Sequence, residues 1–216
     1  MSLTLHYHPL SSYCMKVLVA LYENGATFTP HIVNLMEEKS RAEFLKLWPI
    51  GKFPVLRDDK RNETVPESTI IIEYLDRHYP GRTRLIPQDA EAAMRTRRMD
   101  RFFDLGLQDP MQKIVGDRFR PAGSKDPFGV DQAKSRLKTA YDVLEKDLPA
   151  NGWAAGADFT MADCAAAPAL FYAEWVVPFS GTHKKAAAYF ERLKARPSFR
   201  RALDEAEPYL KMFPKE

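Results

Sequence analysis

The sequence predicts a chain whose first part mixes strands and helices and whose second part is all helical. Over roughly the first eighty residues, alternating and helical patterns of apolar residues follow one another. From Gln88 onward the helical pattern continues with almost no strand pattern. Between the two parts lies the segment PGRTRLIPQ, Pro80 to Gln88, which holds two prolines and a glycine, as linkers do. We therefore expect an α/β domain at residues 1–80, a linker at 81–87 and an all-α domain at 88–216.

Composition narrows the kind of protein. The chain has 216 residues, 45% hydrophobic and 28% charged, which is typical of a soluble protein with a substantial core. A formal charge of +3 does not indicate a nucleic-acid partner. No apolar run approaches the roughly 20 residues that span a membrane, and the N-terminus lacks a signal-peptide pattern. The two cysteines, Cys14 and Cys164, are far apart, which favours a reducing cytoplasm and no zinc site.

The elements of the first part follow from short patterns. A strand is predicted at residues 3–7 by the alternating LTLHY, and a helix by SYCMKVLVALYENG, which ends at the C-cap pair Asn24–Gly25. A second strand is predicted by TFTPHIV, and a short helix by KSRAEFLKLW, with Ser40 as its cap and Pro49 as its stop. Two further strands are predicted by FPVLRDD and NETV around the polar turn RDDKR, and a last helix by ESTIIIEYLDRHYPG. The order is βαβ, then a helix, then ββα.

The stretch SSYC stands where the first strand gives way to the first helix. Ser11 or Ser12 is an N-cap residue, which accepts a hydrogen bond from a free amide of the helix. The same position suits chemistry, because a helix N-terminus stabilises an anion such as a thiolate. Ser-x-x-Cys also has the spacing of a Cys-x-x-Cys redox motif whose first cysteine is replaced by serine. From the pattern alone, the cap and the chemical role both remain open.

Two other motifs have a structural and a functional interpretation each. In WPIGKFPVL, Pro54 begins a strand, and a cis peptide bond before it would expose the backbone of Phe53 for pairing with an extended peptide. In PESTIIIEYL, either Glu67 or Ser68 caps a helix. Alternatively, Ser68 and the first helical amides hold a carboxylate while Glu67 meets an ammonium group.

Taken together with one more motif, these stretches resemble a known family. The segment ADFTMADCAAAPAL carries the capping box Thr160-x-x-Asp163, flanked by Phe159 and Cys164 in the positions of a hydrophobic staple. At these intervals the four motifs resemble those of cytosolic glutathione transferases over nearly the whole chain, in particular a bacterial, serine-type, theta- or zeta-like member. The resemblance implies a thioredoxin-like N-terminal domain that binds glutathione and a helical domain that forms the pocket for an electrophile.

The resemblance also implies roles for particular residues. Pro54 would be the cis-proline, and the backbone of Phe53 would pair with the cysteinyl part of glutathione. Glu67 and Ser68 would hold the γ-glutamyl end. Two lysines match positions where related classes place a basic residue near the glycine carboxylate: Lys39 and Lys52.

The catalytic position is implied to be Ser11, with Ser12 and Tyr7 as rivals. The Ser11 hydroxyl would donate a hydrogen bond to the glutathione sulfur and favour the thiolate, which attacks a hydrophobic, electrophilic small molecule. Cys14 would be structural, because cysteine-type members place their cysteine at position 11. Glutathione would be a co-substrate, with no metal, in a cytoplasmic homodimer. The alternative is a non-catalytic regulatory or binding protein, similar to the bacterial stringent starvation protein.

Overall fold

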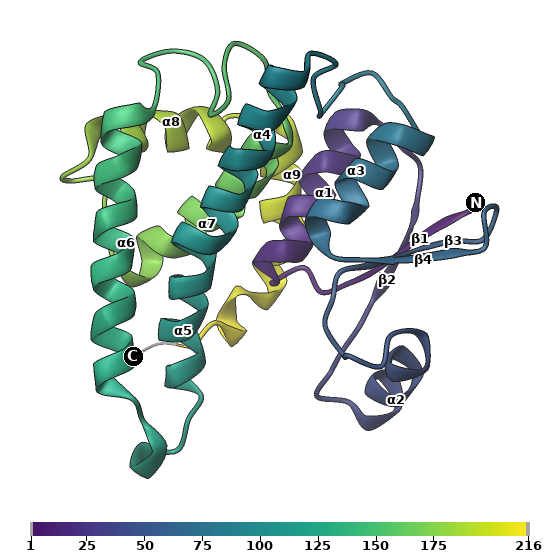
Figure 1. Ribbon diagram of the computed structural model, residues 1–216. Helices are drawn as coiled ribbons and strands as arrows, with labels where there is room; N and C mark the ends of the chain where they lie inside the picture. Colours follow the sequence, from purple (N-terminus) through teal and green to yellow (C-terminus); the bar gives the residue numbers. More distant parts are fainter. Residues whose placement is uncertain (1, 215–216) are drawn as a thin grey trace.

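The computed structural model describes residues 2–214 and has the two-part architecture expected from the sequence (Figure 1). The first part holds a four-stranded sheet in the order β2-β1-β3-β4. Its strands are β1 (Leu3–Tyr7), β2 (Thr29–Ile32), β3 (Val55–Asp58) and β4 (Glu63–Pro66). β1 pairs with β2 in parallel, and β3 is antiparallel to both β1 and β4. The helices are α1 (Ser12–Asn24), α2 (Glu38–Leu47) and α3 (Ser68–His78), with α1 and α3 above the sheet and α2 below it in Figure 1. This arrangement is the predicted thioredoxin-like domain.

Helix α1 connects the sheet to the second part of the molecule. Ser11 is its N-cap and accepts a hydrogen bond from the amide of Cys14, while Gly25 ends it with φ of 83°, a left-handed conformation that favours glycine. Apart from Tyr13 and Tyr22, every residue of this helix is buried. It packs on α3, and also on α7 and α9 of the helical domain. The end of α1 that carries Ser11 is therefore held rigidly between the two parts.

Two helices begin differently from the sequence prediction. α2 has Glu37 at its N-cap, without a side-chain hydrogen bond, so the prediction of Ser40 as the cap is wrong. The helix begins earlier than expected, and the Ser40 hydroxyl accepts a hydrogen bond from the amide of Asn34 in the preceding loop instead. α3 has Glu67 at its N-cap, also without a side-chain hydrogen bond. The prediction that Glu67 or Ser68 caps α3 through its side chain is therefore not confirmed.

The second part is helical, as predicted. Its elements are α4 (Ala90–Phe102), the π-helical turn η1 (Phe103–Gln108), α5 (Asp109–Arg118), the 3-10 turn η2 (Ala122–Ser124), α6 (Pro127–Asp147), α7 (Met161–Val176), α8 (Lys184–Lys194), α9 (Pro197–Ala206) and the 3-10 turn η3 (Glu207–Met212). The π turn joins α4 to α5 without a break, and Figure 1 shows the two as one long column beside α6. None of the described helices combines the length and the apolar character that a membrane span needs.

The capping box of α7 is present as predicted. Thr160 Oγ1 accepts from the amide of Ala162 at 3.3 Å, and the Asp163 carboxylate accepts from the amide of Thr160 at 2.8 Å. Asp163 is also held by the amide of Ala154 and the hydroxyl of Tyr189. The box therefore anchors the loop before α7 and helix α8 as well as the helix it caps.

The segment between α3 and α4 is packed against the helical domain. Leu85 is fully buried, its amide donates to the Asp76 carboxylate, and its carbonyl accepts from the amide of Met161. The predicted limits of the linker, 81–87, remain a prediction. What the contacts establish is that this segment fixes α3 to the start of α7.

Candidate functional site

Two neighbouring cavities lie where the two parts of the molecule meet. One has a volume of about 480 Å³ and is lined mainly by polar side chains of the first domain and of α4 to α5. The other has a volume of about 410 Å³ and is largely apolar. Phe53 and Gln112 line both, so the two cavities adjoin. A polar and an apolar compartment side by side can hold two different molecules in contact.

The polar cavity brings together most of the predicted binding residues. Lys52, Phe53, Pro54, Glu67 and Ser68 all line it. Side chains that the sequence analysis did not single out also line it: Tyr13, Trp48, Thr69, Ile70, Arg101, Asp104, Asp109 and Gln112. Lys39 lies in α2, is exposed, and is not among the residues lining this cavity.

The backbone of Phe53 is available for pairing. The Phe53–Pro54 peptide bond is cis, as the resemblance implied. Neither the amide nor the carbonyl of Phe53 makes a backbone hydrogen bond within residues 2–214. The ring of Phe53 is half-buried and stacks near His8, with the ring centroids 6.2 Å apart. An extended peptide in the polar cavity would therefore meet an unpaired donor and an unpaired acceptor.

The N-terminus of α3 opens into the same cavity. Glu67 has φ of 69°, which costs a non-glycine residue of the order of 1–3 kcal/mol and is common at functional sites. Ser68 is buried and begins the helix, whose first amides have no partner within it. Because no side chain caps these amides, they and the helix dipole are free to hold a carboxylate. The exposed Glu67 carboxylate beside them suits an ammonium group.

A buried cluster of ion pairs lies beside the polar cavity. Lys16 Nζ lies 2.6 Å from Asp100 Oδ1 and 2.8 Å from Asp104 Oδ2, and donates to Thr69 Oγ1 at 2.9 Å. Arg101 also reaches Asp104, at 2.9 Å. Burial raises the pKa of Asp100, although the Lys16 ammonium opposes this. The cluster joins α1 and α3 to α4 and η1, and fixes Thr69 and Asp104 at the edge of the polar cavity.

Ser11 lines the apolar cavity, close to the polar one. Its side chain is half-buried, and its Oγ accepts from the amide of Cys14 at 3.4 Å. Because that bond uses a lone pair, the hydroxyl hydrogen is left to donate elsewhere. Much of the apolar cavity is lined by side chains of α5, the residue after it, α7 and the chain after η3: Met111, Val115, Phe119, Tyr172 and Phe213. His8, Leu10 and Phe53 of the first domain line it as well.

Burial separates Ser11 from its rivals. Ser12 also lines the apolar cavity, but it is 5% exposed and its Oγ accepts a hydrogen bond from Gln108 Nε2. Tyr7 is 4% exposed and lines neither cavity. Burial, with a smaller contribution from Glu205, raises the pKa of Tyr7 to about 12. Of the three hydroxyls, that of Ser11 is the most accessible.

Cys14 has the properties of a structural thiol. It is fully buried, and burial raises the pKa of its thiol to about 12, against the opposing effect of its hydrogen bond with Ser11. A thiol with so high a pKa holds its proton at neutral pH and is a poor nucleophile. This agrees with the structural role expected from the sequence. Within residues 2–214, no three His, Cys, Asp or Glu side chains gather as they would around a metal ion.

Comparison with known proteins places the chain in a family. The domain described as "Glutathione S-transferase, N-terminal domain" matches residues 5–83, and "Glutathione S-transferase, C-terminal domain" matches residues 127–205. Glutathione S-transferase 3 of Zea mays is 31% identical over 214 residues, covering 93% of each protein. The chain therefore belongs to the cytosolic glutathione transferase family.

Two further comparisons bear on what the protein does. A solved glutathione S-transferase of Methylobacillus flagellatus, with glutathione bound, has a TM-score of 0.85 and 27% identity, covering 93% of this chain and 98% of that one. A stringent starvation protein A homolog of Histophilus somni is 27% identical over 208 residues, covering 95% of this chain and 92% of the relative. Relatives named as transferases and a relative with another kind of name are thus similarly close.

Proposed function

We propose that the protein is a glutathione transferase that binds glutathione in the polar cavity and joins it to a hydrophobic electrophile in the apolar one. The observation that carries this proposal is the half-buried Ser11 hydroxyl, at the N-terminus of α1, beside two adjoining cavities of opposite character. The glutathione-bound relative supports the choice of ligand. The half-buried serine supports a serine-type enzyme, and the two buried free cysteines suit a cytoplasmic one.

The binding mode follows from the groups that line the polar cavity. The amide and carbonyl of Phe53 would pair with the cysteinyl part of glutathione. The amides that begin α3, with Ser68, would hold the γ-glutamyl carboxylate, and Glu67 would hold its ammonium group. Lys52, exposed at the cavity, would meet the glycine carboxylate. Lys39 was assigned the same role by resemblance, and its position in α2 leaves Lys52 as the better candidate.

In the catalytic step, the protein needs only to stabilise the thiolate form of glutathione. Ser11 donates a hydrogen bond to the sulfur, and the partial positive charge at the start of α1 adds to the stabilisation of the thiolate. The thiol proton goes to solvent. The thiolate then forms a carbon–sulfur bond with the electrophile, and the electron pair leaves with the displaced group or stays on the electrophile. No bond to serine forms.

The test is an ultraviolet titration of the bound thiolate. Ser11→Ala should keep glutathione bound, because most contacts lie elsewhere, and should raise the pH at which the bound thiol ionises. Turnover at neutral pH should fall and partly recover in alkaline buffer. The matched control is Ser12→Ala, which removes a buried hydroxyl one residue away. A shift in Ser12→Ala or Tyr7→Phe, with none in Ser11→Ala, would assign the role to one of the rivals.

A second candidate function is favoured by the Histophilus somni relative. A non-catalytic regulatory or binding protein of this fold would need no thiol activation. Retention on immobilised glutathione, followed by an assay with a panel of electrophiles, separates the two. An enzyme should be retained and should turn over at least one electrophile in a manner that depends on Ser11. A protein that is neither retained nor active would favour the second candidate.

A further inference from the structure

His8 is a polar side chain of the apolar cavity to which the proposed function gives no role. It follows β1 directly and lines the apolar cavity together with Ser11, but it does not line the polar cavity. Its imidazole is half-buried, and burial lowers its pKa below the ordinary value of histidine, so the ring is neutral at neutral pH. A neutral imidazole carries one proton, on either Nδ1 or Nε2.

A backbone hydrogen bond determines which nitrogen carries this proton. The amide of Leu10 donates to His8 Nδ1 at 3.2 Å, and a ring nitrogen that accepts a hydrogen bond holds no proton. The proton of the neutral ring is therefore on Nε2. This Nε2 makes no hydrogen bond within residues 2–214. His8 thus brings an unused N–H donor to the wall of the apolar cavity.

Two aromatic rings and the backbone hold the imidazole in place. The Phe53 ring stacks on it, with the centroids 6.2 Å apart and the planes inclined by 21°. The Tyr209 ring of η3 meets it at 72°, with the centroids 5.0 Å apart. The carbonyl of Leu10 accepts from the hydroxyl of Tyr172 at 2.7 Å, so the residue that orients the imidazole is itself held. Because the donor is already oriented, little ordering is needed when a ligand binds.

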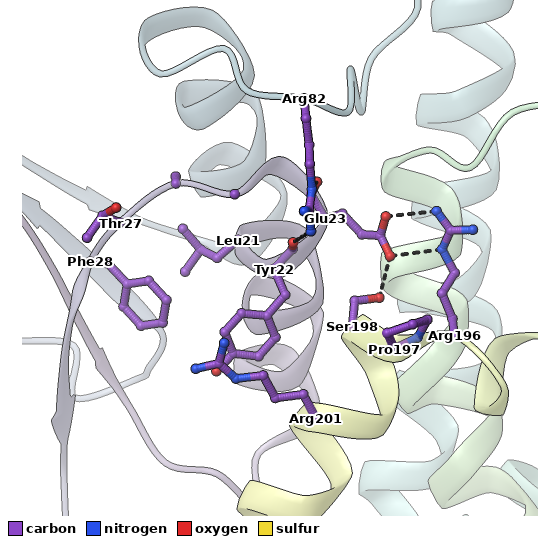
Figure 2. A pocket seen from close by; sticks show the side chains of 12 residues that line it. Leu21, Tyr22, Glu23, Thr27, Phe28, Arg82, Arg196, Pro197, Ser198 and Arg201 are labelled. Atoms are coloured by element: carbon purple, nitrogen blue, oxygen red, sulfur yellow. Dashed lines mark hydrogen bonds and ion pairs between the residues drawn. The ribbon is translucent and has the colours of Figure 1, made fainter.

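The C-terminal segment that carries Tyr209 is anchored to the first domain. Figure 2 shows the pocket where α1 and α9 meet, with Glu23 of α1 beside Arg196 and Ser198. Arg196 donates to both carboxylate oxygens of Glu23 at 2.8 Å, and Ser198 donates to one of them. Helix α9 packs on α1, and η3 follows α9 directly. These contacts between the domains keep Tyr209 against His8.

The rest of the apolar cavity offers an electrophile few other donors. Within residues 2–214, none of its lining side chains belongs to Asp, Glu, Lys or Arg. The Tyr172 hydroxyl is used by Leu10, and Ser12 is covered by Gln108. Gln112 carries an amide, but its side chain is exposed. In such an apolar site a hydrogen bond to a developing charge is stronger than in water, which favours the half-buried imidazole as the donor.

We propose that Nε2–H of His8 binds the carbonyl oxygen of the electrophile, and that the preferred electrophiles are neutral α,β-unsaturated carbonyl compounds with an aromatic body. This inference rests on the proposed transferase function and specifies the kind of electrophile. The aromatic body would lie against the rings that line the cavity, those of Phe53, Phe119, Tyr172 and Phe213.

The reaction is then an addition in which no group leaves. The thiolate forms a carbon–sulfur bond with the β-carbon, and the electron pair of the carbon–carbon double bond moves towards the carbonyl. The carbonyl oxygen takes the negative charge of an enolate. His8 keeps its proton and stabilises this oxygen through the hydrogen bond. A proton from solvent, which replaces the one that the thiol lost, adds to the α-carbon and gives the thioether.

The tautomer of His8 can be measured without any activity. Two-bond nitrogen–proton correlation spectra of the isotope-labelled protein should show a neutral ring with its proton on Nε2. A neutral ring with its proton on Nδ1 would overturn the proposal, because Nε2 would then be an acceptor.

Two electrophiles separate a hydrogen bond to oxygen from a general effect on the cavity. Benzylideneacetone places the charge on its carbonyl oxygen, whereas benzyl chloride loses it with chloride. His8→Phe keeps a ring but removes the donor, and should lower kcat/KM at least about tenfold for benzylideneacetone and much less for benzyl chloride. His8→Gln, whose amide nitrogen can take the place of Nε2, should recover part of this loss, and His8→Asn, whose amide matches Nδ1, should not. His31→Phe, at an exposed histidine of β2 that lines neither cavity, should change neither reaction.

Binding without reaction distinguishes this proposal from the transferase function on which it rests. Benzylacetone keeps the carbonyl but cannot react, and butylbenzene lacks the carbonyl. Calorimetry should show that His8→Phe weakens benzylacetone more than butylbenzene. Equal losses for these two ligands, or equal losses of kcat/KM for the two electrophiles, would overturn the proposal. A wild-type protein that turns over neither electrophile, but prefers benzylacetone in a manner that depends on His8, would contradict the transferase function and still support the hydrogen bond.

Discussion

At the scale of single residues, Glu67 shows how a binding role can be separated from a structural one. Its φ of 69° is strained for glutamate but comfortable for glycine. Glu67→Gly should therefore leave the melting temperature nearly unchanged, because relief of strain offsets the greater freedom of the unfolded chain. It should weaken glutathione at least tenfold, because an ammonium group loses a charge-assisted partner, which contributes about 1.5–3 kcal/mol.

Calorimetry and thermal unfolding on the same samples check this. Glu67→Ala is the matched variant: it removes the same carboxylate but keeps the strain, so it should bind as weakly and melt lower than Glu67→Gly. Ser68→Ala should also bind glutathione at least tenfold more weakly. Wild-type affinity in all three variants would show that these residues serve the helix start alone.

The choice between Ser11 and Ser12 shows what sequence could and could not provide at this scale. Both serines fit an N-cap and a catalytic position, and spacing alone leaves a one-residue uncertainty. What separates them is Gln108, which lies in the π turn and covers Ser12. A contact between residues so distant in the chain leaves no local pattern. For the same reason, the sequence did not predict that Tyr13, Arg101 and Gln112 line the polar cavity.

At the scale of elements, the buried carboxyl of Asp58, at the end of β3, should make the stability of the fold depend on pH. Asp58 is buried, which raises the pKa of its carboxyl, but hydrogen bonds from Tyr79, Tyr74 and the amides of Arg61 and Lys60 lower it overall. A carboxyl with a lowered pKa in the folded state stabilises the fold above its unfolded pKa of about 4, and this contribution is lost as the pH falls through the folded value.

Urea unfolding at several pH values tests this. Asp58→Asn should be less stable than the wild type at about pH 7, and the gap in unfolding free energy should narrow towards about pH 3. Asp59→Asn is the control, because that carboxylate is 65% exposed and, among residues 2–214, its side chain pairs with Arg57 alone. If the difference in unfolding free energy stays constant with pH, Asp58 stabilises the fold through its packing and not through its charge.

The capping box of α7 predicts unequal losses from its two members. Thr160→Ala removes one cap and should cost about 0.5–2 kcal/mol. Asp163→Ala should cost more, because it also leaves the amide of Ala154 and the hydroxyl of Tyr189 without a partner. Glutathione affinity in the folded fraction should stay nearly unchanged in both. Equal losses, or a loss of affinity without a loss of stability, would contradict this account.

Elements were predictable where a local signal determined them. Thr160 and Asp163 stand three residues apart and satisfy each other, so the start of α7 could be located from sequence. Ser40 has the same chemistry but caps nothing, because Asn34 in the preceding loop competes for its hydroxyl. The π turn at Phe103–Gln108 has no pattern of its own, since apolar spacing continues through it. Its effect is seen only when Asp104 and Gln108 meet α1.

At the scale of the whole molecule, the buried cluster around Lys16 joins the two domains. Lys16 is 1% exposed and holds Asp100 and Asp104, which are 0% and 5% exposed. Lys16→Met leaves the buried Asp100 carboxylate without a cation and leaves Asp104 paired with Arg101 alone, and it should cost about 3–5 kcal/mol. Lys138→Met, at an exposed position, should cost little. Adding Asp100→Asn to Lys16→Met should recover part of the loss, because one unpaired charge is removed. Equal stability of Lys16→Met and Lys138→Met in urea unfolding would contradict the role of the cluster.

The last prediction concerns the oligomeric state of the protein. A homodimer, with the first domain of one subunit on the second domain of the other, was expected from the family resemblance. Three exposed apolar side chains indicate where the dimer interface would lie. They are Ile70 on α3, Met94 on α4 and Leu105 on η1, which are 52%, 64% and 52% exposed. The Arg97–Glu73 ion pair, at 2.7 Å, links α4 to α3. These side chains come from both domains, as such an interface requires.

Sedimentation at micromolar concentration should give a mass twice the chain's 24.7 kDa. Met94→Glu with Leu105→Glu should give the single-chain mass, because burying two unpaired carboxylates in an interface costs several kcal/mol. Met36→Glu is the control: Met36 is 89% exposed, before α2, and away from α3 and α4. A wild-type protein of single-chain mass would contradict the dimer. A dimer that survives the double change would keep the assembly but place its interface elsewhere, and a dimer lost in Met36→Glu would move it to the α2 side of the sheet.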